Sequence, residues 1–412
     1  MSFNFPASPT VGQAFPVTPI AGTPQYRWDG VAWVVVPYDP FAFVARAGDT
    51  MTGPLVLPAD PATALQAATK QYVDAAKAAN SPLETLAFSG IQINGSMEVV
   101  QEFGYEFQST VSGTALADGW KIFKSGTMAF SGGSSFSVRI TQGINCSLFA
   151  VITTAQPALG AVDYTVVQQL IEGFRIARLE WGNASARPIT IGFWSQHNRA
   201  GLYSVAISNP DATRSYVAMY TQAVSNTPQW NTVVIPGCPD GAWPRDAGIG
   251  MALTFSMGSG STLTAPIANA WLTGSYQAGP GQVNAVAATS DAFRITGVVM
   301  LPGSHVITAL QSPFLMRPFA FELLECQRYF YKRTANVFGY NVASAVVGQW
   351  FPHPVEMRAF PTMTLLAGGT YTNVSNLIMD QANTKGYRTY CTMIATGTGA
   401  ADGFNITASA RL

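Results

Sequence analysis

The sequence predicts a mainly β protein made of several parts in series. Residues 86–312 hold short segments of alternating apolar and polar character, separated by Gly, Ser, Asn and Pro, with almost no helical periodicity. One amphipathic helix is predicted, at residues 61–80, and the 412 residues leave room for two to four domains. We therefore expect an N-terminal hairpin, a short coiled-coil-like helix, a jelly-roll β-sandwich and a small C-terminal β-domain.

A β-hairpin is predicted within residues 1–40, which are rich in Pro and Gly. Residues 26–28 and 31–33 flank Asp29-Gly30, a two-residue turn whose residues tolerate the positive φ of a type I′ turn. Two strands are not stable in isolation. We therefore expect this hairpin to dock on other chains.

The predicted helix begins at Asp60, a good N-cap, and Pro61, which suits the first helical position. The residues of its apolar seam follow each other at alternating spacings of three and four, as in a coiled coil: Leu65, Ala68, Tyr72, Ala75 and Ala79. A helix of this length, with Ala filling most of the seam, is marginal in water without partners. It therefore either joins two or three chains around an axis or lies on a neighbouring domain.

Two motifs in and before this helix resemble a known family. Gly-Asp-Thr-Met-Thr-Gly-Pro-Leu at residues 48–55 and Ala-Thr-Lys-Gln-Tyr-Val-Asp at residues 68–74 resemble the repeat that recurs in tail fibre proteins of tailed bacteriophages. In that family the repeat belongs to the trimeric connecting part of a fibre. The resemblance implies that residues 41–85 form this part of a homotrimeric fibre, which is short because one copy of the repeat is present.

The Trp-Asp-Gly-x-x-Trp hairpin at residues 28–33 looks like the N-terminal part of other phage tail proteins. By that resemblance, residues 1–40 are a virion-proximal anchor that binds a phage tail or baseplate protein. Alternatively, the hairpin only covers the end of the trimer.

Strands are predicted in the middle region at residues 136–140, 189–194, 232–235 and 293–299. The one helix-like stretch there, residues 166–172, is expected to form a short crossover element. This pattern predicts the jelly roll of residues 86–312.

Three segments of this region, residues 119–123, 271–274 and 293–298, are similar to jelly-roll modules of phage tail proteins that look like carbohydrate-binding domains. In that group the last strand often reads Thr-Gly-Val-Gln-Leu-Glu-x-Gly. Residues 296–303 of this chain lack the acidic residue, so any ligand or calcium role of that Glu is in doubt here.

Residues 313–412 carry a further resemblance to the same phage proteins. A short helical turn that ends in Cys326-Gln-Arg-Tyr-Phe330 resembles a junction in which the last residue is Tyr, and residues 351–362 and 403–412 continue the likeness. The pattern of the residues predicts strands at 327–333, 362–366, 387–394 and 403–410. We expect a small β-domain at the distal tip, held around the trimer axis.

Composition restricts the partners. Charged residues make up 11% of the chain and the formal net charge is zero, which argues against nucleic acid. No apolar run approaches the length of a membrane span, so no membrane insertion is expected. No basic segment followed by an apolar one is visible in the first residues. We expect a protein assembled in the host bacterial cytoplasm and located in the virion tail.

Neither a cofactor nor a metal site is predicted. Cys146, Cys238, Cys326 and Cys391 are far apart in sequence and are interpreted as free, buried thiols. The residues His197, His305 and His353 are likewise scattered and are interpreted as ordinary core or surface residues.

No nucleophile and base are placed together by a recognised motif, so no enzyme activity is predicted. A glycosidase would need two carboxylates across a cleft. The pairs Glu172 with Glu180 and Asp240 with Asp246 are the candidates.

Sugar binding needs exposed aromatic faces, together with amides or carboxylates for the hydroxyl groups. Five aromatic residues close in sequence to Asn, Asp, Gln or turn residues are candidate platforms: Trp230, Trp243, Tyr371, Tyr387 and Tyr390. The alternative for each is packing in the core or between subunits.

Three functions follow from these observations. The first is a homotrimeric tail fibre that binds a host-surface glycan or protein without reacting with it. The second is a structural tail or baseplate component that binds another virion protein. The third is a glycan-depolymerising tailspike, which would usually show a long repeat-built β-helix that is not visible here. We predict the first.

Overall fold

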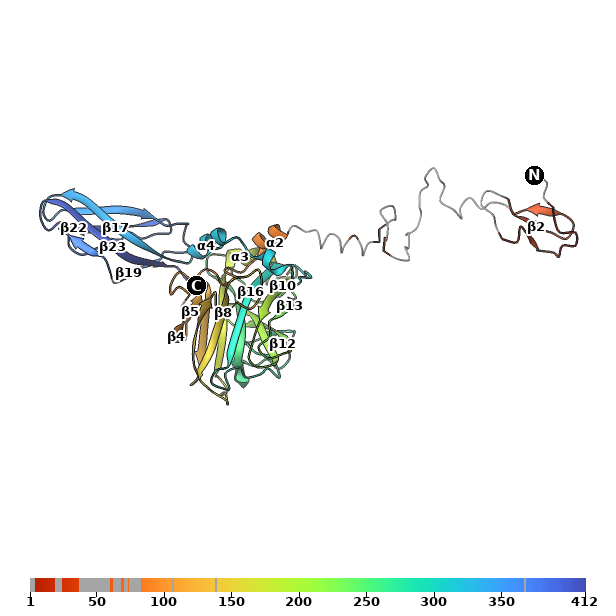
Figure 1. Cartoon of the computed structure of the whole chain (residues 1–412), viewed down its shortest axis with the longest axis horizontal. Helices are drawn as coiled ribbons and strands as arrows, with labels where there is room; N and C mark the ends of the chain where they lie inside the picture. Colours follow the sequence, from red (N-terminus) through yellow and green to blue (C-terminus); the bar gives the residue numbers. More distant parts are fainter. Residues whose placement is uncertain are drawn as a thin grey trace. The chain divides into compact units, whose positions relative to one another are not determined.

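The computed structural model describes residues 4–18, 24–36, 60–61, 68–69, 73, 83–105, 107–137, 139–366 and 368–412. The chain forms two compact units, Met1–Ala75 and Ala76–Leu412 (Figure 1). Most of the predicted oligomerising helix lies outside the described residues, including Leu65, Tyr72, Ala75 and Ala79. Ala68 has no regular secondary structure, whereas Val73 is helical and donates its backbone N–H to the carbonyl of Thr69 at 3.1 Å.

The N-terminal unit contains the predicted hairpin, formed by β2 (Tyr26–Trp28) and β3 (Trp33–Val35). The predicted two-residue turn is wrong, because Trp28 pairs with Trp33 and the loop is four residues long. The Asp29 carboxylate explains the longer loop. Its Oδ1 accepts the backbone N–H groups of Val31 at 2.8 Å and Ala32 at 2.7 Å.

A third strand of the same chain, β1 (Ala14–Phe15), completes this hairpin by pairing with β2. The ring of Phe5 packs against Phe15, Tyr26 and Trp33, with ring centroids 5.1–5.2 Å apart. The hairpin therefore finds partners for one strand edge and for its aromatic side chains within its own unit, and docking on other chains stays a prediction.

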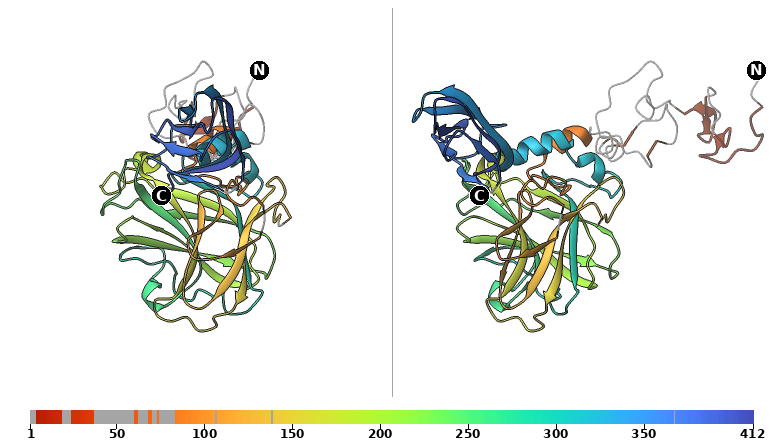
Figure 2. Two further views of the ribbon diagram at one scale, coloured as in Figure 1. Left: turned by 90° about the vertical axis from the view of Figure 1, so that its left-hand side faces the viewer. Right: turned by 60° about the vertical axis from the view of Figure 1, so that its left-hand side comes forward.

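The middle region is a jelly-roll-like β-sandwich of two antiparallel sheets packed face to face (Figures 1 and 2). The six-stranded sheet runs β13 (Gln229–Ile235), β10 (Ile189–Ser195), β16 (Ala292–Pro302), β8 (Ser147–Thr154), β7 (Ala129–Ser135) and β4 (Gln108–Thr110). The seven-stranded sheet runs β15 (Trp271–Thr273), β12 (Arg214–Gln222), β11 (Gly201–Ser208), β14 (Ile249–Ser259), β9 (Tyr164–Glu172), β6 (Trp120–Ser125) and β5 (Thr114–Ala117). Large apolar side chains such as Phe193 and Phe255 fill the core between them. The predicted mainly β fold is confirmed.

Three of the four strands predicted in the middle region lie in β10, β13 and β16. The described residues of the predicted strand at 136–140, which are 136, 137, 139 and 140, are not in a strand, because β7 already ends at Ser135 and Phe136 is exposed. The predicted helix at residues 166–172 is also wrong, since these residues belong to β9, between β14 and β6.

The polar pair Gln168-Gln169 concealed the alternation of this strand. The side chain of Gln169 is buried and exchanges two hydrogen bonds with the backbone of Ile93, at 3.1 and 2.8 Å. Helical turns follow the strand directly, as α3 (Gly173–Ile176) and η1 (Ala177–Leu179).

Short helices cover part of one outer face of the sandwich. Side chains of α2 (Leu83–Ser89) and η3 (Ser312–Leu315) pack on the outer face of the six-stranded sheet, where Val299 and Leu301 of β16 are buried. A further turn, η2 (Ser261–Leu263), follows β14.

The C-terminal β-domain begins after α4 (Phe319–Gln327) and consists of two small antiparallel sheets (Figure 1). One sheet contains β17 (Phe330–Asn341), β23 (Gly397–Ser409), β19 (Thr362–Leu365) and β20 (Thr370–Thr372). The other runs β18 (Val346–Pro352), β22 (Gly386–Thr392) and β21 (Ile378–Asp380). The predicted strands fall in β17, β19, β22 and β23, although β17 begins only at Phe330 because Gln327 ends α4.

A buried ion pair fixes α4 against the sandwich. Arg317 and Glu322 are both buried, with two nitrogen–oxygen contacts of 3.0 and 3.1 Å to the Arg317 Nη1. Arg317 also donates to the carbonyls of Gly90 and Gln92, and Glu322 accepts the backbone N–H of Asn94 at 2.5 Å. Arg317 and Glu322 therefore bind each other and also the backbone of residues 90–94, so the pair joins the start of α4 to the start of the sandwich. Figure 2 shows α2 and α4 together at the same end of the sandwich.

Replacing Glu322 with Gln would lower the free energy of unfolding by about 3–5 kcal/mol, because Arg317 would keep a buried charge without its counter-ion. Chemical denaturation of the two proteins measures this difference. Glu180→Gln is the matched control, since the side chains of Glu180 and Arg245 pair at 3.0 Å while 41% and 40% exposed. The free energy of unfolding of this control should fall by at most about 1 kcal/mol. Equal losses in the two variants would contradict the role of Glu322 as the counter-ion of a buried Arg317.

The buried carboxylate of Asp118 makes stability depend on pH. Burial raises the pKa of Asp118 from 3.8 to about 6, although Gln101 donates its backbone N–H and its side-chain amide to the carboxylate. Because the folded-state pKa is the higher one, the folded state binds the proton more tightly. The resulting stabilisation is complete below about pH 3.8 and is lost as the pH rises through about 6.

Asp118→Asn should remove this dependence. Between pH 4 and pH 7, the unfolding free energy of the unmodified protein should fall relative to that of the variant by roughly 2–3 kcal/mol, a little under the equivalent of two pKa units. Denaturation series at several pH values measure the difference. Parallel pH profiles for the two proteins would show that Asp118 keeps its ordinary pKa.

Candidate functional site

The outer face of the β18-β22-β21 sheet is the candidate binding surface. Directly opposed residues of an antiparallel sheet share a face. One row across the strands is Trp350, Arg388 and Asp380, and the next is Gly348, Tyr390 and Ile378. We call these six residues the aromatic face.

Trp350 presents the larger ring of the aromatic face. Its side chain is 45% exposed, although it belongs to the interior of a strand. A Cβ atom added to Gly386 would lie 2.8 Å from two carbon atoms of the indole, so the ring lies directly over this glycine. The absence of a side chain at position 386 therefore lets the indole lie against the sheet.

Tyr390 and the ion pair lie beside it. The guanidinium of Arg388 stands 4.9 Å from the centroid of the Tyr390 ring, a cation–π contact. Arg388 also donates from Nε to Oδ1 of Asp380 at 2.8 Å and from Nη2 to Oδ2 at 2.5 Å. These hydrogen bonds lower the pKa of the Asp380 carboxyl and raise that of Arg388. The pair therefore stays ionised at neutral pH.

This arrangement suits a carbohydrate. An exposed ring can cover the apolar side of a pyranose, and a carboxylate and a guanidinium offer acceptors and donors for its hydroxyl groups. The rings and the polar groups are held on strands, with side-chain directions set by the sheet.

The structure does not bring the five predicted sugar platforms together. Tyr390 belongs to the aromatic face, and Tyr371 lies on the neighbouring sheet. Tyr371 is 42% exposed, but its hydroxyl accepts the backbone N–H of Leu377 and its ring packs 4.6 Å from that of Phe404.

Two of the predicted platforms are wrong. Tyr387 is fully buried, with its ring against Phe351 and His353. Trp243 is also buried, packed edge-on against Trp181, and donates its indole N–H to the carbonyl of Asp240. Neither can offer a free ring face, because both rings are covered by their neighbours. The polar residues next to them in the sequence did not reveal this burial.

Trp230 is partly buried. Its indole N–H donates to the carbonyl of Ile307 at 2.9 Å, and its ring centroid lies 5.7 Å from that of Trp194.

Trp350 was not predicted from the sequence. The signal was present, because Val347 and Phe351 point inward with even spacing and leave position 350 on the outer face.

A second pair of exposed rings lies on the other small sheet. Phe338 and Tyr340, separated by one residue, both lie on the outer face of β17 and are 74% and 71% exposed. Thr398 and Ala400 of β23 stand opposite them. No charged group accompanies these rings in the two rows.

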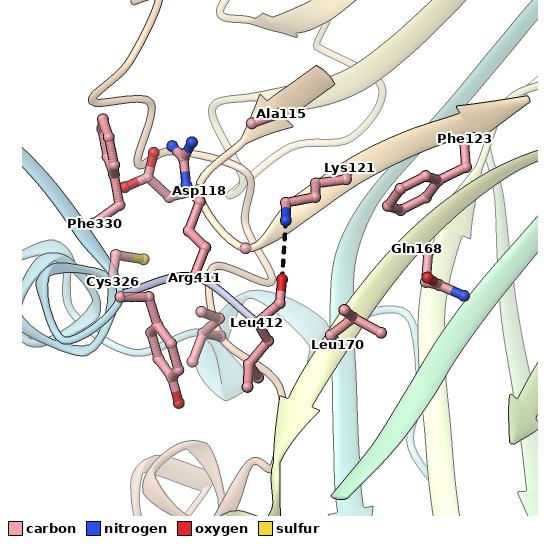
Figure 3. Close-up of a pocket in the computed structure, with 13 residues that line it drawn as sticks. Ala115, Asp118, Lys121, Phe123, Gln168, Leu170, Cys326, Phe330, Arg411 and Leu412 are labelled. Atoms are coloured by element: carbon pink, nitrogen blue, oxygen red, sulfur yellow. Dashed lines mark hydrogen bonds between the residues drawn. The ribbon is translucent and has the colours of Figure 1, made fainter. Parts of the chain in front are cut away.

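A narrow cavity lies where the C-terminal segment meets the sandwich (Figure 3). Lys121 donates from Nζ to the carbonyl of Leu412 at 3.0 Å, and the guanidinium of Arg411 lies 3.7 Å from the ring centroid of Phe330. The space holds about 30 Å³. It can take water but not a sugar ring, so we assign it to the packing of this junction.

The carboxylates considered for catalysis have other partners. Glu172 is buried and accepts hydrogen bonds from Arg328 at 2.6 and 3.0 Å and from the Tyr329 hydroxyl at 2.7 Å. In the same way, Glu180 pairs with Arg245 and Asp240 with Arg214. Asp246 accepts the backbone N–H of Gly248.

The four cysteines are free and buried, as predicted. Burial lowers the pKa of His197 to about 3, and its Nε2 is hydrogen-bonded to the hydroxyl of Tyr220. His305 contacts the carbonyl of Pro302, and His353 contacts the hydroxyl of Tyr331. Among the described residues, no three His, Cys, Asp or Glu side chains gather as a metal site would require. Within the same residues, we find no helix with the length and apolar character to cross a membrane.

Comparison with known proteins gives weak likenesses. No protein-family model and no curated protein matches the chain. Among solved structures, the enzymatically active domain of tailspike protein 4 of bacteriophage CBA120 is similar, with 12% identity and a TM-score of 0.30 over 52% of this chain and 22% of that one. A CBM4 protein matches at 17% identity and a TM-score of 0.25, over 52% of this chain and 99% of that one.

The family 11 carbohydrate-binding module of Lic26A-Cel5E from Clostridium thermocellum matches at 12% identity with a TM-score of 0.24, over 50% of this chain and 98% of that one. The match to the tailspike spans less than a quarter of that chain's length. Likenesses at these values do not indicate what this chain binds.

Proposed function

We propose that this chain is the subunit of a short, homotrimeric bacteriophage tail fibre that binds a host-surface glycan during attachment and leaves it intact. The aromatic face carries this proposal. It combines two partly exposed rings with an ion pair on the outer side of a sheet, where no described segment of the chain covers Trp350. The resemblance of residues 48–74 to the repeat of tail fibre proteins supports the phage assignment, and with it a location in the virion tail.

Exposed aromatic side chains support association between copies of the chain. The rings of Phe88 on α2 and Phe321 on α4 pack 5.3 Å apart, yet both are more than half exposed, as are Phe174 and Phe319. Such a patch is unusual on a monomer. Phe88 belongs to α2 (Leu83–Ser89), which follows the predicted oligomerising helix in the sequence. We call Phe88, Phe174, Phe319 and Phe321 the neck patch and assign it to contacts between subunits.

The N-terminal unit would bind a phage tail or baseplate protein. It is a compact unit of its own, and the most exposed of its described large apolar side chains are Val11, Val17 and Val31. These residues would contact the anchoring protein.

Binding without cleavage is supported by the ion pairs of the candidate carboxylates. Glu172 is fully engaged by Arg328 and Tyr329, so it is not available as a general acid or nucleophile.

Trp350→Ala and Tyr390→Ala should each weaken binding of the purified oligomer to extracted host-surface glycan by at least about tenfold, or ~1.4 kcal/mol, because each removes a ring of the aromatic face. Isothermal titration and adsorption to host cells measure this. Phe360→Ala is the matched control, since Phe360 is exposed in the same domain but outside the aromatic face.

Other results would change the assignment. If the unmodified oligomer binds neither host cells nor their glycans, the chain is a structural tail or baseplate component. Shortened glycan would mean that it is a depolymerising tailspike.

Phe88→Asp combined with Phe321→Asp should lower the mass of the assembly in sedimentation experiments, because two carboxylates would be buried in the subunit contact. Phe360→Asp tests the same chemistry outside the neck patch and should leave the mass unchanged. An unchanged mass in the double variant would exclude the neck patch from the subunit interface.

A further inference from the structure

We infer that Asp380 restricts the aromatic face to uncharged glycans, by neutralising Arg388 and by repelling acidic sugars. This inference rests on the proposed function, because it specifies the ligand class of the same site. The ligands excluded are glycans that carry uronic acids, sialic acids or phosphate.

The ion pair between Asp380 and Arg388 has a defined geometry. Both carboxylate oxygens of Asp380 accept hydrogen bonds from Arg388, in the bidentate form that fits a guanidinium best. Asp380 stands directly opposite Arg388 in the register of β21 and β22. The partner of the cation is therefore set by the sheet and does not depend on a loop.

Within the two rows of the aromatic face, Arg388 is the one cation. Residues 334–355, 359–379 and 389–401 contain no Lys, Arg, Asp or Glu. The next cations lie outside these rows, and one of them, Lys385, directly precedes Gly386, over which the Trp350 ring lies. Arg333 is placed over the ring of Phe351 and donates to the carbonyl of Pro352, and Lys385 precedes β22. Within the aromatic face, one positive charge is matched by one negative charge.

An acidic sugar placed over Trp350 and Tyr390 would meet the Asp380 carboxylate, and the two rows of the face hold no second cation to compensate it. Specificity often depends on such a repulsive element as well as on attraction. A neutral sugar meets no such penalty. The carboxylate has acceptor sites beyond the two that Arg388 uses, and the guanidinium has N–H donors beyond Nε and Nη2, so both can bind hydroxyl groups.

Asp380→Asn is the direct test, because it removes the negative charge at almost unchanged shape and frees Arg388. Binding of neutral and uronic-acid oligosaccharides of equal length is measured by titration at low and high salt. The unmodified protein should bind the neutral oligosaccharide, with little dependence on salt, and not the acidic one. Asp380→Asn should gain at least tenfold in affinity for the acidic oligosaccharide, and high salt should weaken this binding.

Arg388→Gln is the second variant, because it removes the cation and keeps the carboxylate. It should remain unable to bind the acidic oligosaccharide. Both side chains are partly exposed, so both variants should fold, which circular dichroism verifies. Neutral binding by the unmodified protein without a gain in Asp380→Asn would overturn this inference alone.

Other outcomes are distinguishable. Salt-sensitive binding of the acidic oligosaccharide by the unmodified protein would also overturn the inference while leaving a glycan-binding fibre. If the unmodified protein binds neither sugar, the proposed function fails and this inference fails with it. A change in the sedimenting mass of Asp380→Asn would assign the aromatic face to a contact with a second copy of the chain.

Discussion

The buried ion pair between Arg317 and Glu322 is the interaction on which the second unit depends. Arg317 stands just before α4 and Glu322 within it, and both bind backbone groups of residues 90–94 at the start of the sandwich. A buried charge is tolerated only when its partners are in place. This requirement fixes the start of the C-terminal β-domain on the sandwich, and the ion pair of Glu172 with Arg328 adds a second contact at the same junction.

In the C-terminal β-domain, the alternation of side chains along β18 and β22 determines which residues are exposed to a ligand. The inward residues of β18 and β22, such as Val347 and Tyr387, form the domain core, and the alternation of the strands then places Trp350 and Tyr390 on the outside. Gly386 supplies the space under the indole. A surface built in this way needs little rearrangement to bind a ligand, which limits the entropic cost of binding.

The strongest local signals in the sequence predicted the fold well. The Val- and Ile-rich runs of β10, β13 and β16, the hairpin at Trp28 and Trp33 and the β strands of the C-terminal domain could all be found from alternation and turn residues. The errors arose where a tertiary partner overrides the local pattern. β9 contains Gln169, whose amide binds the backbone of Ile93, a partner far away in sequence. Of the candidate site, only Tyr390 was predicted. Trp243 and Tyr387 are buried by packing that no neighbouring residue reveals, and the pairing of Arg388 with Asp380 depends on strand register.

The most direct measurement is a crystal structure of the protein soaked with oligosaccharide fragments of the host-surface glycan. The account predicts a sugar ring stacked on Trp350, with hydroxyl groups within hydrogen-bond distance of Asp380 and Arg388. A sugar bound on the exposed rings of Phe338 and Tyr340 instead, or an aromatic face covered by a neighbouring subunit of the assembly, would contradict it.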